Sequence, residues 1–443
     1  MTALRASLGV IVLSVAVGFE ATAEAQQAVA TYTLQEAQRL ALGNYQTIQT
    51  AQEQVGQARL LRRQATGAVL PTVTVNTVGT RNFFTGAFDF GGRRVEVLPA
   101  FDYNLSLSIT QPIYAGLRDL KTREQADLNI GVTGRGLQAT MQDALLETTR
   151  AYYQVLSARE NVAISTRAAE VARETLRVAN VLVRAGEEPE TSALRARVAT
   201  SEAQRELLEA KNAETLALQQ LAILIGADTE FDVVRPAPVA HAVEPLDDLI
   251  GEAWSTRAEL RSLDLQRRIA ELEVEKQRGQ YQPVVRAEGT YVKRRASFPS
   301  DQLSSVSVNA TWTIFEGGRI AADVATARSR LRQVELQRDL LRRQVEQQVR
   351  AAYLAIETLS ASLDLVTAQA EFARRNATST DRAFRVGEAT DLDLLTANQA
   401  VTRAERQLSV TGYMLEVARH ELGRATGRFA AELMPVASGG EQQ

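Results

Sequence analysis

The 443-residue chain contains no cysteine and only two histidines. The absence of cysteine excludes disulfide bonds, thiolate metal sites, cysteine nucleophiles and a lipid anchor on an N-terminal cysteine. His241 lies in a proline-containing linker and His420 in a helical stretch far along the chain, which argues against a shared metal site or a Ser/His/Asp triad. We therefore expect no catalytic, cofactor-binding or metal-binding residues and no enzyme activity.

Neither sign of charge dominates, with 50 Lys and Arg against 53 Asp and Glu. No global electrostatic field therefore favours nucleic acid as a partner. Long apolar runs are also missing, because beyond the N-terminus no run reaches the 18 or more apolar residues that a membrane-spanning helix needs. If the protein lies in a membrane, we expect it to be inserted by strands and not by a helix.

The N-terminus is typical of a secretory signal peptide, expected over residues 1–25. Arg5 precedes an apolar run over residues 8–19, and small residues follow up to Ala25. The mature chain is expected to start near Gln26.

The same order of motifs occurs twice in the chain. Gly387 follows Gly186 by 201 residues, and the same offset relates the motif IYAGLR to IFEGGR. A constant offset at independent places indicates a tandem duplication. Pro283 follows Pro71 by 212 residues, so the first copy has a loop 11 residues longer between Pro71 and Gly116.

Each copy is expected to contain a helix of some thirty residues, two strands, a very long helix, a glycine break and a last helix. The first copy, residues 26–232, has these elements at about 34–64, 69–81, 101–112, 118–183 and 190–226. The second copy, residues 246–427, has them at about 246–279, 283–293, 304–314, 319–383 and 390–427. Residues 233–245 are expected to be a linker and residues 428–443 a C-terminal tail.

The second long helix carries a stripe of apolar residues spaced by three and four. The stripe includes Ile356, Leu359, Leu363, Val366 and Ala370. This spacing predicts a coiled-coil seam, and 65 residues at 1.5 Å each give a length of roughly 100 Å.

Two stretches, FDYNLSLSIT from Phe101 and SVSVNATWTI from Ser305, alternate apolar and polar residues over ten positions. Such alternation commonly marks a half-buried strand of a soluble sheet, but 9 to 11 residues is also the length of a tilted membrane strand. Four strands cannot close a barrel, and an open edge is not tolerated in lipid, so several chains must contribute. The residues expected to face lipid are Leu105, Leu107, Ile109, Val306, Val308 and Trp312.

The tandem repeat, the LP and QP turns before the strands, YAGLR, FEGGR and the VGEATDLDLL break together resemble the TolC-like outer membrane efflux family. The resemblance covers nearly the whole mature chain. It implies a mixed α and β fold, in which long antiparallel coiled-coil helices form a periplasmic tunnel and four strands per chain join a trimeric 12-stranded barrel. The implied location is the outer membrane of a Gram-negative bacterium, with a large periplasmic portion. The implied partners are two further copies of the chain, outer membrane lipid, a periplasmic adaptor (membrane fusion) protein and, through it, an inner-membrane pump, but no nucleic acid.

The resemblance also assigns roles to residues near the glycine breaks, which become turns at the periplasmic tip. The residues expected to contact the adaptor are Gly186, Glu187, Val386, Gly387 and Glu388, and the strand-to-helix turns are Gly116, Gly317 and Gly318.

Asp393 matches a family position, six residues past the tip glycine, where carboxylates from three chains ring the closed entrance. The second such aspartate of the family is Thr396 here, and Asp391 is a candidate to replace it. The spacing of Thr390 and Asp393 independently predicts a capping box at the start of a helix, a role compatible with the ring.

The function expected from these features is passive export of small molecules through the exit duct of a tripartite efflux pump. One alternative is the exit duct of a type I protein secretion system, which has the same architecture. A less favoured alternative is a soluble periplasmic adaptor, which should have one helical hairpin and small β-domains instead of two hairpins and four amphipathic strands.

Overall fold

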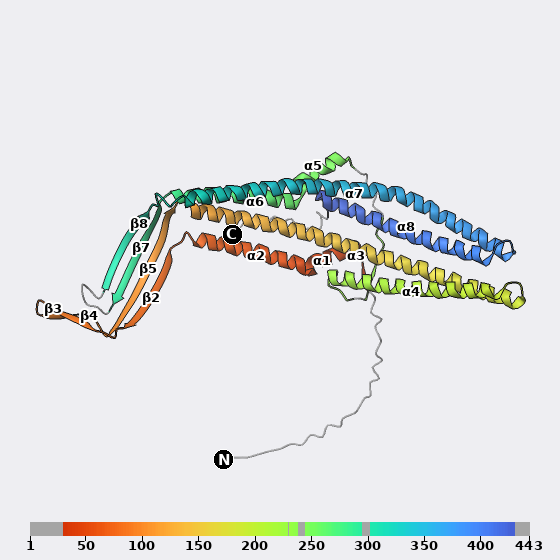
Figure 1. Cartoon of the computed structure of the whole chain (residues 1–443), viewed down its shortest axis with the longest axis horizontal. Helices are drawn as coiled ribbons and strands as arrows, with labels where there is room; N and C mark the ends of the chain where they lie inside the picture. Colours follow the sequence, from red (N-terminus) through yellow and green to blue (C-terminus); the bar gives the residue numbers. More distant parts are fainter. Residues whose placement is uncertain (1–29, 229, 238–243, 295–301, 430–443) are drawn as a thin grey trace, which may run out of the picture.

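A computed structural model describes residues 30–228, 230–237, 244–294 and 302–429. The signal peptide expected at 1–25 lies outside the described residues, as does nearly all of the expected tail at 428–443. The molecule is long and narrow, with a sheet at one end and two helical turns at the other (Figure 1).

Eight α-helices in the described residues build most of the length. They are α1 (Leu34–Asn44), α2 (Gln46–Gly67), α3 (Arg118–Ala185), α4 (Glu190–Ile225), α5 (Leu246–Thr256), α6 (Ala258–Arg278), α7 (Arg319–Arg385) and α8 (Asp391–Thr426). A 3-10 turn, η1 (Gly279–Tyr281), follows α6. The pairs α3–α4 and α7–α8 form two antiparallel hairpins that reach the same end of the molecule (Figure 1).

The first helix of each copy, expected to be continuous, is in fact two helices. The chain breaks after Asn44 and again after Thr256, although neither break contains a proline. The Asn44 side chain donates to the Ile225 carbonyl (2.9 Å), and the Thr256 hydroxyl donates to the Thr426 carbonyl. The prediction of one helix is wrong because, in each copy, this break is bonded to the end of the copy's last helix.

Four antiparallel strands form the main sheet in the order β2 (Thr72–Arg81), β5 (Phe101–Ala115), β7 (Val284–Arg294) and β8 (Gln302–Thr311). The longer loop of the first copy contains a further hairpin, β3 (Gly86–Phe90) and β4 (Arg93–Leu98), which the sequence analysis did not predict. A short parallel pair, β1 (Ala30–Tyr32) and β6 (Phe231–Val233), was also not predicted.

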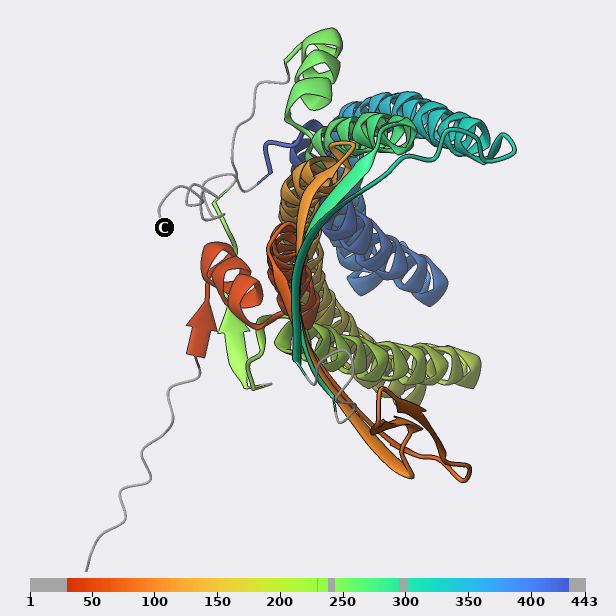
Figure 2. The same cartoon turned by 90° about the vertical axis from the view of Figure 1, so that its left-hand side faces the viewer.

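Seen from the sheet end, the sheet and the helices follow one arc that is open on its concave side (Figure 2). The β1–β6 pair and α5 lie on the convex side (Figure 2). Beneath β1 and β6, a core of residues from α1, α3 and α4 includes the fully buried Tyr152, Leu221 and Ile225. The Tyr152 hydroxyl donates to the Val234 carbonyl (2.6 Å), and burial raises the pKa of Tyr152 to about 12.

A buried ion cluster joins the two copies at mid-length. The Arg424 guanidinium on α8 donates to Glu259 on α6 (2.6 Å) and to Asp143 on α3 (2.8 Å), and Arg257 donates to the same glutamate (3.1 Å). Burial raises the pKa of Glu259, but the two guanidinium groups outweigh this effect, so the net shift is downward. Because Arg424 bonds to α3 and to α6, the cluster fixes α8 against both helices.

One helix of the described part, α7, contains an 18-residue stretch that is apolar enough, by length and composition only, to cross a membrane. Helix α7 packs against α8, where Ile356 lies with Leu415 and Ala418 in one buried cluster. Only 11% of the apolar stretch is buried within the chain, so packing against α8 covers little of it.

Candidate functional site at the two ends of the molecule

The two hairpin turns have the same construction. Gly186 (φ +76°) ends α3, and Gly387 (φ +80°) follows the end of α7, so both adopt the left-handed conformation that glycine tolerates best. The N–H groups of Glu187 and Glu388 donate to carbonyls five residues earlier, at 3.0 and 2.9 Å. These bonds satisfy the last carbonyls of α3 and α7 and reverse the chain within a few residues.

The residues predicted to contact an adaptor lie together at this end of the molecule (Figure 1). All five of them are exposed: Gly186, Glu187, Val386, Gly387 and Glu388. Val386 exposes 71% of its surface, which is high for an aliphatic side chain. The turns therefore expose two carboxylates and one apolar side chain.

Asp393 forms the predicted capping box at the start of α8. Its carboxylate accepts hydrogen bonds from the N–H (2.9 Å) and the hydroxyl (2.6 Å) of Thr390, whose hydroxyl oxygen accepts from the Asp393 N–H (3.2 Å). These bonds, chiefly the one from the hydroxyl, lower the pKa of Asp393 below its usual 3.8. The capping role of Asp393 is confirmed, and its carboxylate remains exposed and ionised.

Asp391, two residues earlier, has a different environment. Its Oδ1 lies 3.3 Å from Nη1 of Arg195 on α4, and its side chain is only 16% exposed. The two residues belong to different hairpins, so the ion pair connects α4 to α8 close to the turns. The charge of Asp391 is thus compensated within the chain, whereas that of Asp393 is not.

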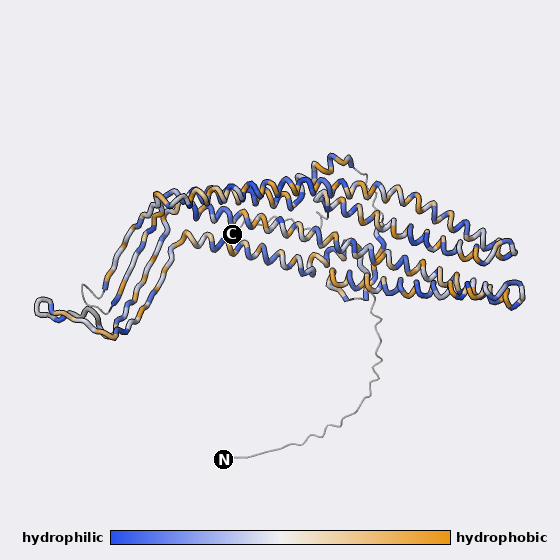
Figure 3. Tube along the Cα trace, in the orientation of Figure 1, coloured by the Kyte–Doolittle hydropathy of each residue, from blue (hydrophilic) through white to orange (hydrophobic). Residues whose placement is uncertain are grey.

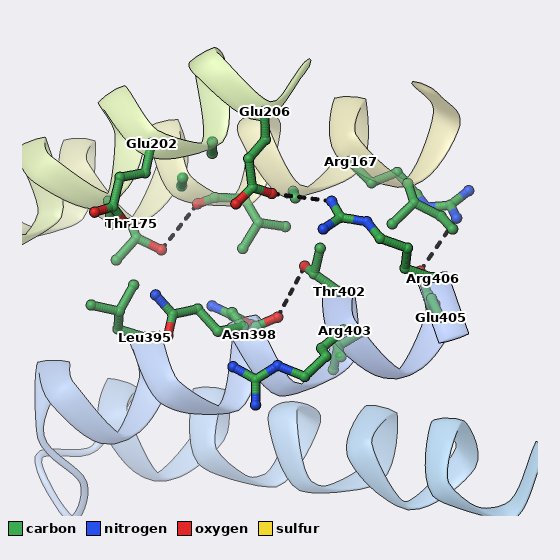
Figure 4. Close-up of a pocket in the computed structure, with 18 of the residues that line it drawn as sticks. Arg167, Thr175, Glu202, Glu206, Leu395, Asn398, Thr402, Arg403, Glu405 and Arg406 are labelled. Atoms are coloured by element: carbon green, nitrogen blue, oxygen red, sulfur yellow. Dashed lines mark hydrogen bonds and ion pairs between the residues drawn. The ribbon is translucent and has the colours of Figure 1, made fainter. Parts of the chain in front are cut away.

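Further from the turns, polar contacts connect the hairpins around a cavity of about 470 Å³ (Figure 4). Arg406 on α8 donates to Glu206 on α4 (3.1 Å) and to Asn161 on α3 (2.9 Å). Arg167 on α3 donates to Glu405 on α8 (3.3 Å). In this region the hairpins are therefore connected by ion pairs whose side chains line the cavity.

At the opposite end, the register of the sheet aligns the residues predicted to face lipid. Ile109 on β5 lies opposite Gly289 on β7, which in turn lies opposite Val306 on β8. With two-residue periodicity, this places Leu105, Leu107, Ile109, Val306 and Val308 on one face and the intervening serines on the other. Figure 3 shows the corresponding alternation of apolar and polar residues along the strands.

Trp312 departs from the predicted strand. The strand expected over residues 304–314 ends at Thr311, and the Trp312 indole N–H donates to the Tyr281 carbonyl in η1 (2.9 Å). Trp312 is still 62% exposed, at the end of the sheet nearest the helices. It therefore lies at the base of the sheet instead of within a strand.

The predicted strand-to-helix turns all contain glycine with positive φ. Gly116 (φ +65°) lies so close to Gly279 that a Cβ atom on it would be 2.1 Å from the Gly279 carbonyl oxygen. Gly317 and Gly318 have φ of +59° and +86° just before α7. Gly116 thus combines a sharp turn with a backbone contact that no other residue type permits.

Sequence analysis missed the basic residues that connect the hairpins, Arg195 and Arg406. No local motif marks them, because their partners lie about 200 residues away in the chain. Within the described ranges, no group of three or more His, Cys, Asp and Glu side chains is arranged to hold a metal ion.

Both copies of the repeat match one family of known proteins. The sequence model of the family described as outer membrane efflux protein matches residues 37–227 and 249–428. The chain is 25% identical over 324 residues to the alkaline protease secretion protein AprF of Pseudomonas aeruginosa, an alignment covering 70% of this chain and 66% of that one. It is 21% identical over 347 residues to the outer membrane efflux protein BepC of Brucella suis, covering 75% of each chain.

Solved structures agree on the fold. The CmeC outer membrane channel of Campylobacter jejuni superposes with a TM-score of 0.79 at 16% identity, over 96% of this chain and 94% of that one. The open MtrE outer membrane channel of Neisseria gonorrhoeae gives 0.74 at 19% identity, over 89% and 88%.

Proposed function

Since this chain belongs to the outer membrane efflux protein family and is an outer-membrane channel protein, we propose that three copies form the exit duct of a tripartite efflux pump. The duct carries small molecules passively from an inner-membrane pump and its periplasmic adaptor across the outer membrane. Transport of this kind makes and breaks no bond, so no catalytic residue is assigned. The alternative of a soluble adaptor is wrong, because the matched family consists of outer membrane proteins.

The observation that supports assembly into a trimer is that the sheet has two unpaired edges. Among the described residues, strands β2 and β8 each pair on one side only, and the apolar face includes exposed Val75, Val306 and Val308. In lipid, each unsatisfied backbone group costs several kcal/mol, so the edges must pair with further strands. Three chains supply twelve strands, which close a barrel with the polar face towards a water-filled lumen.

The long helices form the periplasmic part of the proposed duct. The arc seen in Figure 2 is open on one side, as expected for one part of a tube wall. Helices α3 and α7 span 68 and 67 residues, which at 1.5 Å each is roughly 100 Å. We assign the antiparallel hairpins to a coiled-coil tunnel whose concave side lines the lumen.

The hairpin turns form the periplasmic entrance in this assembly. Asp393 is exposed and charged, and three copies near the trimer axis would form a ring of carboxylates that attracts cations. Asp391 is less suited to such a ring because Arg195 compensates its charge. The exposed turn residues, Val386 among them, are assigned to contact with the adaptor.

A second function is favoured by one relative, AprF, whose name describes protease secretion. A duct for a type I secretion system would have the same barrel and tunnel, so the cargo must be measured. The test is a strain from which this chain is deleted, compared with the same strain carrying the chain on a plasmid. The efflux function predicts increased accumulation of a fluorescent dye in the deletion strain, reversed by the plasmid, and an unchanged set of proteins in the medium. Loss of one secreted protein with unchanged dye accumulation would contradict efflux and support secretion.

A further inference from the structure

Two cations lie among otherwise uncharged strand positions on the face of the sheet that carries Leu107 and Val306, and both lie at the end of the sheet far from the helices. Arg81 is the last residue of β2, opposite Phe101, and Lys293 on β7 is opposite Leu105. Strand alternation places Arg81 on the face of Val73 and Val75, and Lys293 on the face of Leu105.

Both side chains are exposed, and neither forms an ion pair among the residues that the structure describes. The Arg81 guanidinium lies 6.0 Å from the centroid of the Phe83 ring. Phe83 and Phe84 are 87% and 89% exposed, and Tyr291 precedes Lys293 by two residues on the same face. Each cation therefore has an aromatic neighbour, the combination found where membrane proteins cross an interface.

The spacing places both cations at one boundary of the apolar band. Arg81 is eight residues from Val73, and Lys293 is eight residues from Val285. Eight residues at 3.3 Å, in a strand tilted by about 40°, rise about 20 Å, close to the roughly 25 Å band of outer-membrane barrels. Figure 1 shows that the outer ends of β2 and β7 reach a similar level along the long axis.

The opposite boundary of this face differs in charge. Towards the helices, its described positions are apolar or neutral, including Val73, Gln111, Val285 and Ala310. A cation on the lipid face costs about 2–4 kcal/mol at the bilayer midplane but about 0–1 kcal/mol near an interface. An interface position therefore makes Arg81 and Lys293 tolerable, and their restriction to one boundary indicates a partner present in one leaflet.

We propose that Arg81 and Lys293 bind the phosphate groups of a phosphorylated glycolipid in the outer leaflet of the outer membrane. This inference rests on the proposed function, which directs this end of the barrel to the cell exterior. Guanidinium and ammonium groups form charge-assisted hydrogen bonds with phosphate oxygens. The adjacent aromatic rings lie at the level where the sugar headgroup meets the acyl chains. A trimer presents six such cations around its outer rim.

The test is native mass spectrometry of the purified trimer in detergent with bisphosphorylated lipid A. Wild type is compared with the double variant R81Q/K293Q and with R286Q, whose arginine is exposed on the polar face of β7. We expect the double variant to retain at least tenfold less lipid A than wild type, and R286Q to retain as much as wild type. Dephosphorylated lipid A should bind weakly to all three proteins.

Equal retention by wild type and the double variant, or equal retention of phosphorylated and dephosphorylated lipid A, would overturn the proposal. Equal retention of phosphatidylglycerol and lipid A would also overturn it, because any anionic lipid would then be sufficient. The mass of the protein assembly, measured in the same experiment, distinguishes these results from a failure of the proposed function. If wild type forms no trimer, the duct is wrong, whereas a lipid-insensitive trimer counts only against the glycolipid site.

Discussion

Arg195 on α4 and Asp391 on α8 form an ion pair between the two helical hairpins, with Nη1 3.3 Å from Oδ1. The residues are 196 positions apart in the chain, and each lies within one or two turns of the start of its helix. The pair therefore connects the two hairpins close to the proposed entrance. A pair with one solvent-accessible partner, here Arg195, contributes only about 0.2–1 kcal/mol, so the connection is weak enough to be broken during transport.

We predict that Asp391→Asn increases the conductance of the resting duct. Removing the carboxylate leaves α4 and α8 with one connection fewer, so the entrance widens more often. The measurement is single-channel recording in planar bilayers at fixed voltage. Arg195→Gln should have the same effect, and the double variant should conduct no more than either single variant. Additive effects of the two substitutions would show that they act independently and not through the pair.

Asp393→Asn should change ion selectivity while leaving the fold nearly intact. Asparagine can still accept the hydrogen bonds from Thr390, so the cap is kept, with a loss of at most about 1 kcal/mol of helix-dipole stabilisation. The charge of the ring is lost, so the reversal potential in a salt gradient should move towards zero and divalent-cation block should weaken. An unchanged reversal potential and unchanged block would reduce Asp393 to a helix cap.

A single arginine on the predicted lipid face should have a larger effect than one on the polar face. Leu107→Arg is expected to cost about 2–4 kcal/mol, because Leu107 lies near the middle of the apolar band. Ser106→Arg, on the adjacent strand position, should cost little because that side chain faces water. The stability of the two variants is compared by thermal unfolding in lipid vesicles. Equal losses of stability would mean that the assignment of the two faces to lipid and water is wrong.

The Glu259 cluster predicts an acid-dependent contribution to stability. The folded pKa of Glu259 is depressed, so its stabilisation is present above the unfolded pKa, near 4.5, and is lost as the pH falls through the folded pKa. Glu259→Gln should cost roughly 2–4 kcal/mol at neutral pH, because Arg424 is buried and loses one of its two carboxylates. The variant should also lose less stability than wild type as the pH falls below about 4.5.

The matched control for this prediction is Glu174→Gln, which removes an exposed pair with Arg177 on α3. Its unfolding midpoint should stay close to that of wild type at neutral pH. Equal effects of the two substitutions would show that burial of the Glu259 cluster has no energetic consequence.

Local features of the fold could be predicted from the sequence. The Thr390–Asp393 cap involves residues three apart, and the alternation from Phe101 to Thr110 involves one strand, so each pattern is complete within a short segment. The breaks after Asn44 and Thr256 could not be predicted, because each depends on contact with a helix end about 170–180 residues away. The Arg195–Asp391 pair depends in the same way on how two hairpins pack.

The assembly of three chains into one duct is the central claim, and the mass of the detergent-solubilised particle tests it most directly. Multi-angle light scattering, with the detergent contribution subtracted, should give the mass of three chains for a fully folded sample. A closed barrel needs all twelve strands, so folded monomers should not be present at any concentration at which the helices are intact by circular dichroism. A folded, stable monomer would contradict the account, because its β2 and β8 edges would then be tolerated without partners.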